Sequence, residues 1–167
     1  HPRTISGIQV IFTRMNGEEE ESVTIKKAAP TLVARNAGVD LGGFFEYEIS
    51  SAEELLAWNK QVVKWTAWDV VTLTADIDCQ GVISSDNWTP NQFGGVFNGN
   101  GKTINNFVIE KAGMAGFFKK LQDATVENLT FGEGCSVTAL SAESADIYAG
   151  SLAGEVRGGT TLKNVIN

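Results

Sequence analysis

The sequence contains very few of the side chains on which metal-dependent and nucleophilic chemistry relies. It has one histidine, at the first position, and two cysteines, Cys79 and Cys135, whose spacing matches no zinc motif. No histidine is therefore available as a general base, and no serine or cysteine stands beside a visible activating partner. We expect no cofactor and no catalysis. Whether the two cysteines pair stays open, because a disulfide requires Cα atoms within about 7 Å.

Positive charge and long apolar runs are also scarce. Thirteen basic residues stand against twenty acidic ones and form no basic stripe, so nucleic acid is not an expected partner. No apolar run approaches the roughly 18 to 20 residues that cross a bilayer, and the N-terminus lacks the features of a signal peptide. Because the chain opens abruptly at His1 and stops inside a strand-like pattern at Asn167, we interpret it as a processed or truncated piece of a longer protein, with any lipid anchor outside it.

Glycine, in contrast, is abundant. The 18 glycines stand beside Asn and Asp at turn-like intervals, against 3 prolines, which predicts many short strands and no long helices. In the first region we expect strands at residues 8–12 and 22–26, joined as a hairpin with an acidic tip, and further strands at 31–34 and 44–49. Residues 1–48 are thus a strand-rich segment, either a β-sandwich remnant or a lead-in to the next domain.

One helix is well signalled where this segment ends. Ser51 and Glu54 form a capping box that begins the helix, which should run to about Lys64. Its apolar face recurs at helical spacing and comprises Leu55, Leu56, Trp58, Val62, Val63 and Trp65. Such a face must pack against other residues, and we expect the helix to cap one end of the domain that follows.

Two short patterns repeat after Trp68. The form Thr, aliphatic, polar, Asn, apolar occurs at residues 103–107, 125–129 and 161–165. Small residues followed by apolar ones occur at residues 93–97, 114–118 and 148–154. Units of this length cannot bury an apolar face alone, so neighbouring units must stack and share a core. We therefore predict an all-β fold, a right-handed parallel β-helix (solenoid) with an N-terminal capping helix, over residues 49–167.

The Asn of the first pattern has a predicted structural role. In a parallel stack Asn106, Asn128 and Asn164 would lie above one another, roughly 4.8 Å apart, as an amide ladder. Their spacings of 22 and 36 residues predict a longer loop in the second unit, within residues 132–146. The stack would end at an exposed edge near Asn167, which implies missing units, a partner chain or self-association there.

The chain beyond residue 49 resembles the GLUG-type β-helix repeat proteins of bacterial surfaces, common in gut Bacteroidetes. The resemblance rests on the order of several stretches, namely Ile49–Leu55, Val71–Asp78, Trp88–Pro90, Phe93–Ile104 and Ala149–Gly154. It implies an exported cell-surface or extracellular protein, often lipid-anchored or fimbria-associated, with an adhesin-like role. The resemblance assigns no catalytic residues.

Few residues qualify as candidate sites. Asp76 and Asp78 place two carboxylates on one face of a strand, which makes them weak calcium candidates, because the other ligands are lacking. The two Asn-Gly steps of residues 98–101 are typical of a tight turn rather than of a phosphate loop. One candidate binding residue is Trp68, the tryptophan that is least constrained by a packing pattern. The others are the polar residues of the expected loop region, namely Ser136, Thr138, Ser141, Glu143 and Ser144.

The function that this sequence favours is a non-enzymatic, adhesin-like surface protein that binds a glycan or protein ligand. The alternative is a carbohydrate-active enzyme, a polysaccharide lyase or glycosidase, or its accessory module, on the same scaffold. A glycosidase needs paired carboxylates. Glu127 is isolated on its strand, with Asn105 and Lys163 expected at the matching positions of the neighbouring strands. A purely structural stalk is a third hypothesis.

Overall fold

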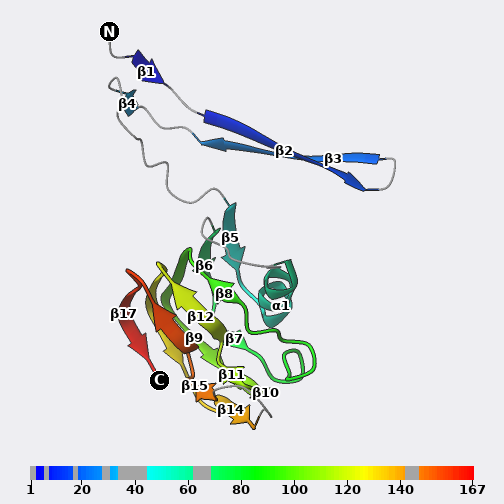
Figure 1. Cartoon of the computed structure of the whole chain (residues 1–167), viewed down its shortest axis with the longest axis vertical. Coiled ribbons are helices and arrows are strands. Elements are labelled where there is room, and N and C mark those ends of the chain that lie inside the picture. The colour runs from blue at the N-terminus through cyan, green and yellow to red at the C-terminus, as the bar shows by residue number, and fades with distance from the viewer. Residues whose placement is uncertain are drawn as a thin grey trace. The chain divides into compact units, whose positions relative to one another are not determined.

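The computed structural model describes residues 3–5, 8–16, 19–27, 31–33, 45–61, 69–141 and 147–167. The chain divides into two compact units, His1–Phe45 and Glu46–Asn167. In the first unit β2 (Ile8–Asn16) pairs with β3 (Glu19–Lys27), and β1 (Arg3–Ile5) pairs with β4 (Thr31–Val33), both antiparallel. The predicted hairpin is confirmed (Figure 1), with most of its acidic run in the first residues of β3.

The described residues of the second unit form one helix and many short strands, as the turn-rich composition predicts. Its elements are β5 (Phe45–Ile49), α1 (Ala52–Gln61), β6 (Asp69–Leu73), β7 (Ile77–Asp78), β8 (Gln92–Phe93), β9 (Val96–Asn105), β10 (Val108–Ala112), β11 (Met114–Ala115), β12 (Phe118–Gln122), β13 (Thr125–Phe131), β14 (Ser136–Leu140), β15 (Tyr148–Ala149), β16 (Ala153–Arg157) and β17 (Thr161–Ile166). Asn, Asp and Gly residues adopt positive φ between or within several of these strands. Most other residue types would be strained in this conformation.

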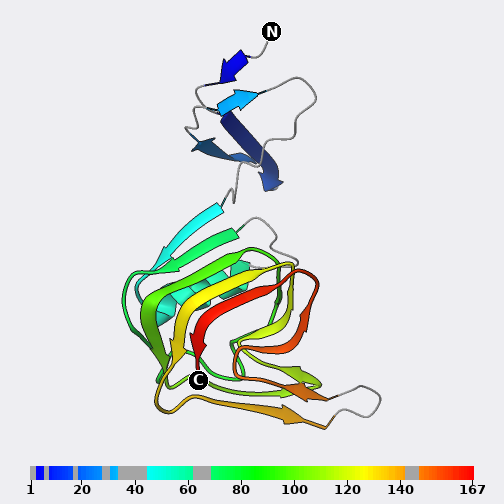
Figure 2. The ribbon, with the colours of Figure 1, turned by 90° about the vertical axis from the view of Figure 1, so that its left-hand side faces the viewer.

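Strands that are far apart in the sequence lie side by side. The largest sheet has the order β17-β13-β9-β6-β5, with β7 also beside β9, and smaller sheets have the orders β16-β12-β8, β10-β14 and β11-β15. Every pairing with a defined register in this unit is parallel. Figure 2 shows β9, β13 and β17 following one another as near-copies. The strand-rich, parallel class is therefore confirmed.

The register tests the predicted repeats one by one. Thr125 pairs with Thr161 and Glu127 pairs with Lys163, so the equivalence of residues 125–129 and 161–165 is confirmed. The equivalence of residues 103–107 with 125–129 is wrong, because Thr125 pairs with Val96 and Thr103 pairs with Thr130. A Thr followed by an aliphatic residue occurs at both Thr103 and Thr125, and local similarity could not show that these are different positions in the sheet.

The second repeated block is likewise half right. Met114 and Ala115 pair with Tyr148 and Ala149, as predicted. Phe93 does not match this position, because it pairs with Leu121 on β12. The sequence similarity matched Phe93 with Met114, whereas its strand partner Leu121 lies seven residues further along the chain (121 − 114).

Helix α1 begins where the capping pattern predicts. The backbone N–H of Glu54 donates to Ser51 Oγ (3.3 Å), and the Glu54 carboxylate accepts hydrogen bonds from the backbone N–H and hydroxyl of Ser50 (2.7 and 2.8 Å). The return bond therefore goes to Ser50 rather than to Ser51. These bonds lower the pKa of the exposed Glu54 carboxyl, with the backbone N–H of Ser50 as the main cause. Residues 62–68, including the expected end of the helix at Lys64, lie outside the described residues.

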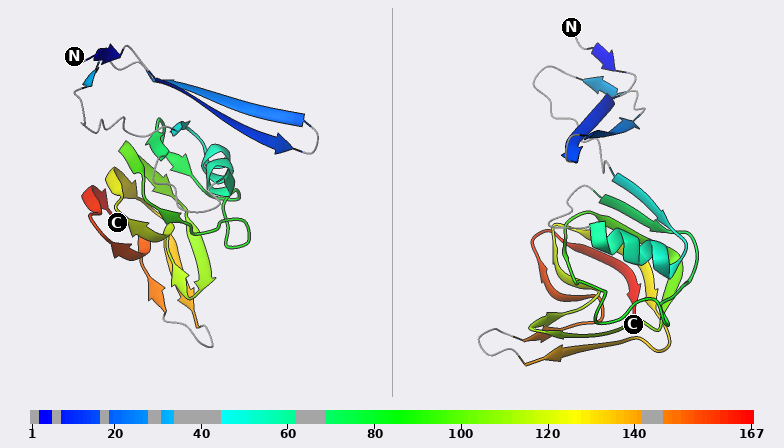
Figure 3. Two further views of the ribbon diagram at one scale, coloured as in Figure 1. Left: turned by 45° about the horizontal axis from the view of Figure 1, so that its top comes forward. Right: turned by 90° about the vertical axis from the view of Figure 1, so that its right-hand side faces the viewer.

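The buried face of α1 packs on an aromatic core. Ala52, Leu55, Trp58 and Asn59 are its buried residues. The Trp58 ring lies 5.9 Å from Phe93, 5.7 Å from Phe97 and 6.4 Å from Phe118, centroid to centroid. Figures 2 and 3 show α1 at one end of this unit and β17 at the other. The helix thus covers the end of the core at which β5 and β6 lie.

Apolar residues at the opposite end are only partly covered. Leu162 is 47% exposed, whereas its register partner Val126 is 0% exposed. Val156 is 49% exposed, whereas its partner Leu121 is 0% exposed. In the described chain β16 and β17 are the outermost strands of their sheets. Val156 and Leu162 therefore occupy positions that are buried in the neighbouring strands, but no further strand of the described residues covers them.

Candidate functional site

The polar residues predicted to bind a ligand converge in part. Ser136 and Thr138 are exposed on β14, while Val137 and Ala139 between them are half-buried. This alternation puts Ser136 and Thr138 on one outward face. Ser141 follows β14 and is also exposed. The other predicted binding residues, Trp68, Glu143 and Ser144, lie outside the described residues.

The neighbouring strand β10 extends this outward face. Val108 pairs with Ser136, and Glu110 pairs with Thr138, in the parallel β10-β14 sheet. Val108 is 46% exposed, and Glu110 is also exposed. We call the outward surface formed by Val108, Glu110, Ser136 and Thr138 the β10–β14 face. It combines apolar, acidic and hydroxyl groups on a rigid pair of strands.

The longer loop predicted within residues 132–146 is confined by the register to the chain after β14, since residues 136–140 are strand. Ala112 pairs with Leu140 and Met114 pairs with Tyr148, so seven residues connect the later pair of strands where one residue connects the earlier pair. Six additional residues (7 − 1) are therefore inserted within the connection 141–147. Large apolar side chains stand at the two ends of this connection, with exposed fractions of 46% at Leu140, 50% at Ile147 and 42% at Tyr148.

These apolar residues were not among the predicted binding residues, because the candidates were chosen from the polar residues of a Ser-rich and Ala-rich loop. The available signal was the presence of three large apolar residues at the two ends of an insertion. Exposed apolar side chains next to polar groups are typical of binding surfaces.

The predicted amide ladder exists with a different first member. Asn164 Nδ2 donates to Asn128 Oδ1 (3.0 Å), and Asn128 Nδ2 lies 3.4 Å from Asn98 Oδ1. Asn106 belongs to another row, in which its Nδ2 donates to Asp78 Oδ1 (2.8 Å). The prediction for Asn106 was wrong because local similarity gave a spacing of 22 residues (128 − 106), whereas the strands pair at 29 residues at Asn98 (127 − 98) and at 27 residues at Lys102 (129 − 102).

The three predicted asparagines nevertheless share one backbone state. Asn106, Asn128 and Asn164 have φ values of 54°, 53° and 50°, the left-handed region that Asn tolerates better than most residues. We call the set Asn98, Asn128 and Asn164 the Asn row. It has a structural role, since each amide bonds to the next strand rather than to solvent alone.

The weak calcium candidates have protein partners. Asp76 Oδ1 accepts the backbone N–H of Thr103 (2.8 Å), and Asp78 Oδ1 accepts from Asn106 Nδ2 and from the backbone N–H of Gln80 (3.0 Å). The bond from Asn106, followed by that from Gln80, lowers the pKa of Asp78. Among the described residues no three His, Cys, Asp or Glu side chains form a group that could hold a metal ion.

The tryptophans of known placement serve the core. Trp58 is 3% exposed, which confirms its place on the buried face of the helix, and Trp88 is 1% exposed. Trp88 Nε1 donates to the carbonyl of Phe117 (3.1 Å), so its polar atom is also used. Neither ring is available to stack on a sugar. The gap between α1 and the core, lined by Trp58, Trp88 and Phe118, has no room for a water-sized molecule.

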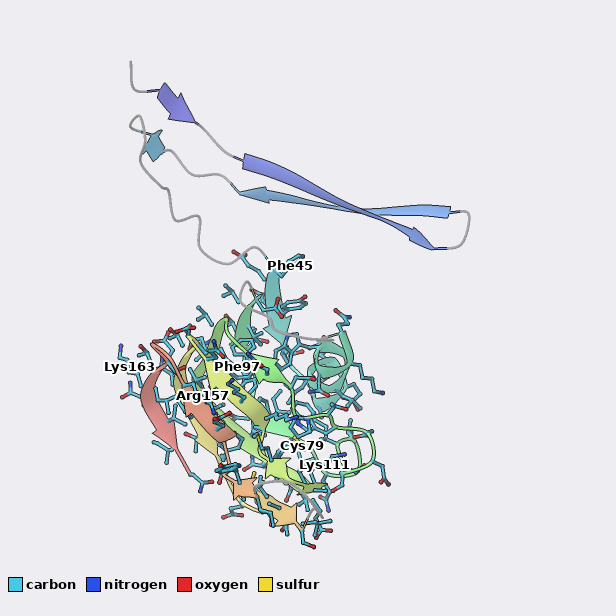
Figure 4. All side chains as sticks on the ribbon, in the orientation of Figure 1. Phe45, Cys79, Phe97, Lys111, Arg157 and Lys163 are labelled. Atoms are coloured by element: carbon cyan, nitrogen blue, oxygen red, sulfur yellow. The ribbon has the colours of Figure 1, made fainter. Side chains whose placement is uncertain are left out.

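Charged groups that could perform catalysis are dispersed. The strand partners of Glu127 are Asn98 and Lys163, rather than the predicted Asn105 and Lys163, so no second carboxylate faces Glu127 on these strands. Lys111, on β10, donates to the carbonyl of Ser85. Lys163 and Arg157 lie on β17 and β16 (Figure 4). No basic groove of the kind that a polysaccharide lyase needs is formed by these three residues.

One buried carboxyl has an unusual environment. Asp69, at the start of β6, is 6% exposed, and the Nε1 of Trp58 lies 3.4 Å from its Oδ2. Burial raises the pKa of Asp69 to about 6, and the bond from Trp58 only partly offsets this effect. Burial, and secondarily the charge of Asp69, raise the pKa of Tyr47 on β5. This group lies beneath α1 and not on an open surface, so we assign it no catalytic role.

The cysteines are free and do not lie on adjacent strands. Cys79 N–H donates to the carbonyl of Asn105, and Cys135 Sγ lies 3.2 Å from the carbonyl of Ile104. The β7 and β13 strands that precede them flank β9 on its two sides, so two strand spacings, about 9.6 Å, separate their backbones. This exceeds the reach of a disulfide. Burial, followed by the nearby Cys135 and Asp78, raises the pKa of the Cys79 thiol to about 12.

Comparisons with known proteins identify no relative. No protein-family model matches the sequence, and no curated protein or solved structure matches it significantly. No helix among the described residues combines the length and apolar character needed to span a membrane.

Proposed function

We propose that residues 49–167 form turns of a right-handed parallel β-helix, and that this scaffold belongs to a non-enzymatic, adhesin-like surface protein. The observation that carries the proposal is the parallel register of β9, β13 and β17 together with that of β10 with β14 and β8 with β12 and β16. Each set recurs in chain order, as expected when every turn of the chain lies on the previous one. The right hand follows from the strong preference of parallel connections.

The scaffold supports a binding role because it displays side chains on a rigid surface. The β10–β14 face and the apolar residues that flank the inserted loop, Leu140 and Ile147, form the candidate contact region. Apolar area beside hydroxyl groups suits a glycan or a protein surface, which offers both kinds of contact. Placement at the cell surface is supported by the resemblance to surface repeat proteins.

A glycan array probed with the intact chain, together with an assay for reducing sugars and unsaturated products, tests this function. We expect binding without product formation. Product formation would overturn the non-enzymatic proposal in favour of a lyase or glycosidase, and the absence of both would favour a structural stalk.

A matched pair of variants tests the location. Thr138→Arg places bulk on the β10–β14 face, and Thr161→Arg places the same bulk on an exposed position of β17. Thr138→Arg should abolish binding and Thr161→Arg should preserve it, with both variants showing the far-UV circular dichroism spectrum of the parent. Equal binding by the two variants would remove the β10–β14 face from the proposal.

A further inference from the structure

Two identical dipeptides occupy very different environments in β9. Asn98-Gly99 and Asn100-Gly101 follow each other at the point where β9 holds three residues opposite a single residue of β13. Glycine has no Cβ, so the backbone nitrogen after an Asn meets the least steric hindrance when it approaches the Asn side-chain amide. Both steps therefore have the same intrinsic chemistry, and only the fold distinguishes them.

The first step is held in place. Asn98 Oδ1 accepts the backbone N–H of Asn100 (2.8 Å) and lies 3.4 Å from Asn128 Nδ2. Gly99 is buried, and a Cβ at this position would lie 2.3 Å from the carbonyl oxygen of Asn128. The backbone here cannot rotate unless β9 separates from β13.

The second step is open. Asn100 and Gly101 are both exposed, with φ values of 52° and 72°. A Cβ at Gly101 would meet no atom within 4 Å. The side chain of Asn100 has one hydrogen bond among those resolved in the described residues, from its Nδ2 to the carbonyl of Leu73 (3.2 Å). Loss of this single partly buried bond frees the side chain.

We propose that Asn100 is a site of spontaneous deamidation in the folded protein, and that the fold protects Asn98. The backbone nitrogen of Gly101 attacks Cγ of Asn100, a C–N bond forms, and the side-chain nitrogen leaves as ammonia after it takes up the proton of the amide. Water then opens the resulting succinimide at either carbonyl. The products are aspartate and isoaspartate at position 100, with water as the only co-reactant.

The reaction changes the contact between two strands of the main sheet. Asn100 Nδ2 is a donor to β6, and the product carries a carboxylate that cannot donate to the carbonyl of Leu73. Isoaspartate also lengthens the main chain by one carbon at the point where β9 bulges. The modified chain is one charge more negative, and its β6–β9 contact should be weaker.

The test is incubation of the whole chain at mildly alkaline pH, followed by peptide mapping with fragmentation that distinguishes aspartate from isoaspartate. In the native protein we expect products at Asn100 to form at least about tenfold faster than at Asn98, since an opening that costs about 1.4 kcal/mol more lowers a rate tenfold. In strong urea the two rates should converge.

Each other outcome contradicts the proposal. Equal native rates, or a faster reaction at Asn98, would show that the contacts of Asn98 and Gly99 give no protection. A reaction at Asn100 in urea alone would show that the native bulge also protects Asn100. The Asn100→Gln variant, which keeps an amide at this position, should show no product there in the folded chain and an unchanged slow rate at Asn98.

Discussion

Replacement of Asp69 by Asn should raise the stability of the second unit at neutral pH and remove a pH dependence. The Asp69 carboxyl is 6% exposed, and its one resolved hydrogen-bond donor, Trp58 Nε1, is at the long distance of 3.4 Å. Burial and the bond from Trp58 are the causes of the pKa shift of Asp69, and no cation among the described residues contributes to it. A buried carboxylate with such limited compensation is costly to ionise.

The sign and size follow from the pKa. Burial raises the pKa of Asp69 from 3.8 to about 6, so the folded state binds this proton more tightly than the unfolded state. Asp69 therefore favours folding most at low pH, and this contribution is lost as the pH rises from about 4 to about 6. At neutral pH the ionised group costs on the order of 2 to 3 kcal/mol relative to an unperturbed carboxyl. Asn keeps an oxygen that can accept from Trp58 without the charge.

Urea unfolding at a series of pH values, followed by tryptophan fluorescence, measures this effect. The difference in unfolding free energy between Asp69→Asn and the parent should grow from near zero at about pH 4 to the full 2 to 3 kcal/mol above about pH 7. Asp86→Asn is the matched control, because it removes the same charge from an exposed side chain. A pH-independent difference, or the same profile for Asp86→Asn, would refute the reasoning.

Three further substitutions test packing and capping. Leu129→Ala should lower the free energy of unfolding by about 2 to 5 kcal/mol, because the Leu129 side chain is 0% exposed. Leu162→Ala should lower it by less than half as much, because Leu162 is 47% exposed. Equal urea midpoints for the two variants would contradict this difference. Gly99→Ala should lower stability more than Gly81→Ala, because a Cβ at Gly99 would clash with β13. Gly81→Ala should cost only the roughly 1 to 2 kcal/mol of a positive φ in open space. The reverse order of melting temperatures would show that β13 can shift to accommodate the added Cβ. Ser51→Ala should cost about 0.5 to 2 kcal/mol by loss of the cap of α1, and an unchanged melting temperature would deny the cap any contribution.

Local chemistry could be predicted wherever a few neighbouring residues determine it. Ser51 and Glu54 marked the start of α1 because a cap needs only one turn of chain. The tight turn predicted for the Asn-Gly steps was wrong, because residues 98–101 lie inside β9 as a bulge; only the positive φ that such steps favour is found, at Asn100 and Gly101. The helix face with Leu55 and Trp58 was predictable, since its spacing alone shows which side is apolar.

Register was predictable only in part. Residues 125–129 and 161–165 match because β13 and β17 pair without a bulge. Residues 103–107 and 125–129 have similar local patterns, and only pairing across the sheet shows that they hold different positions in it. Asn106 was placed in the wrong row because the local patterns gave a spacing of 22 residues (128 − 106) where the strands pair at 27 to 29 (129 − 102 and 127 − 98). Phe93 was misplaced by the same error, since its partner Leu121 lies 28 residues on (121 − 93) and the predicted Met114 only 21 (114 − 93).

The sequence by itself determined the strand-rich class, the start of the capped helix and the existence of a longer loop, because each depends on backbone preferences or on spacing along the chain. Only the tertiary structure decided which asparagines stack, which apolar residues flank the loop, and that Asp69 lies buried under Trp58. These depend on contacts between residues that are far apart in the chain. The two Asn-Gly steps show the distinction most directly, because identical dipeptides differ solely in what the neighbouring strands place around them.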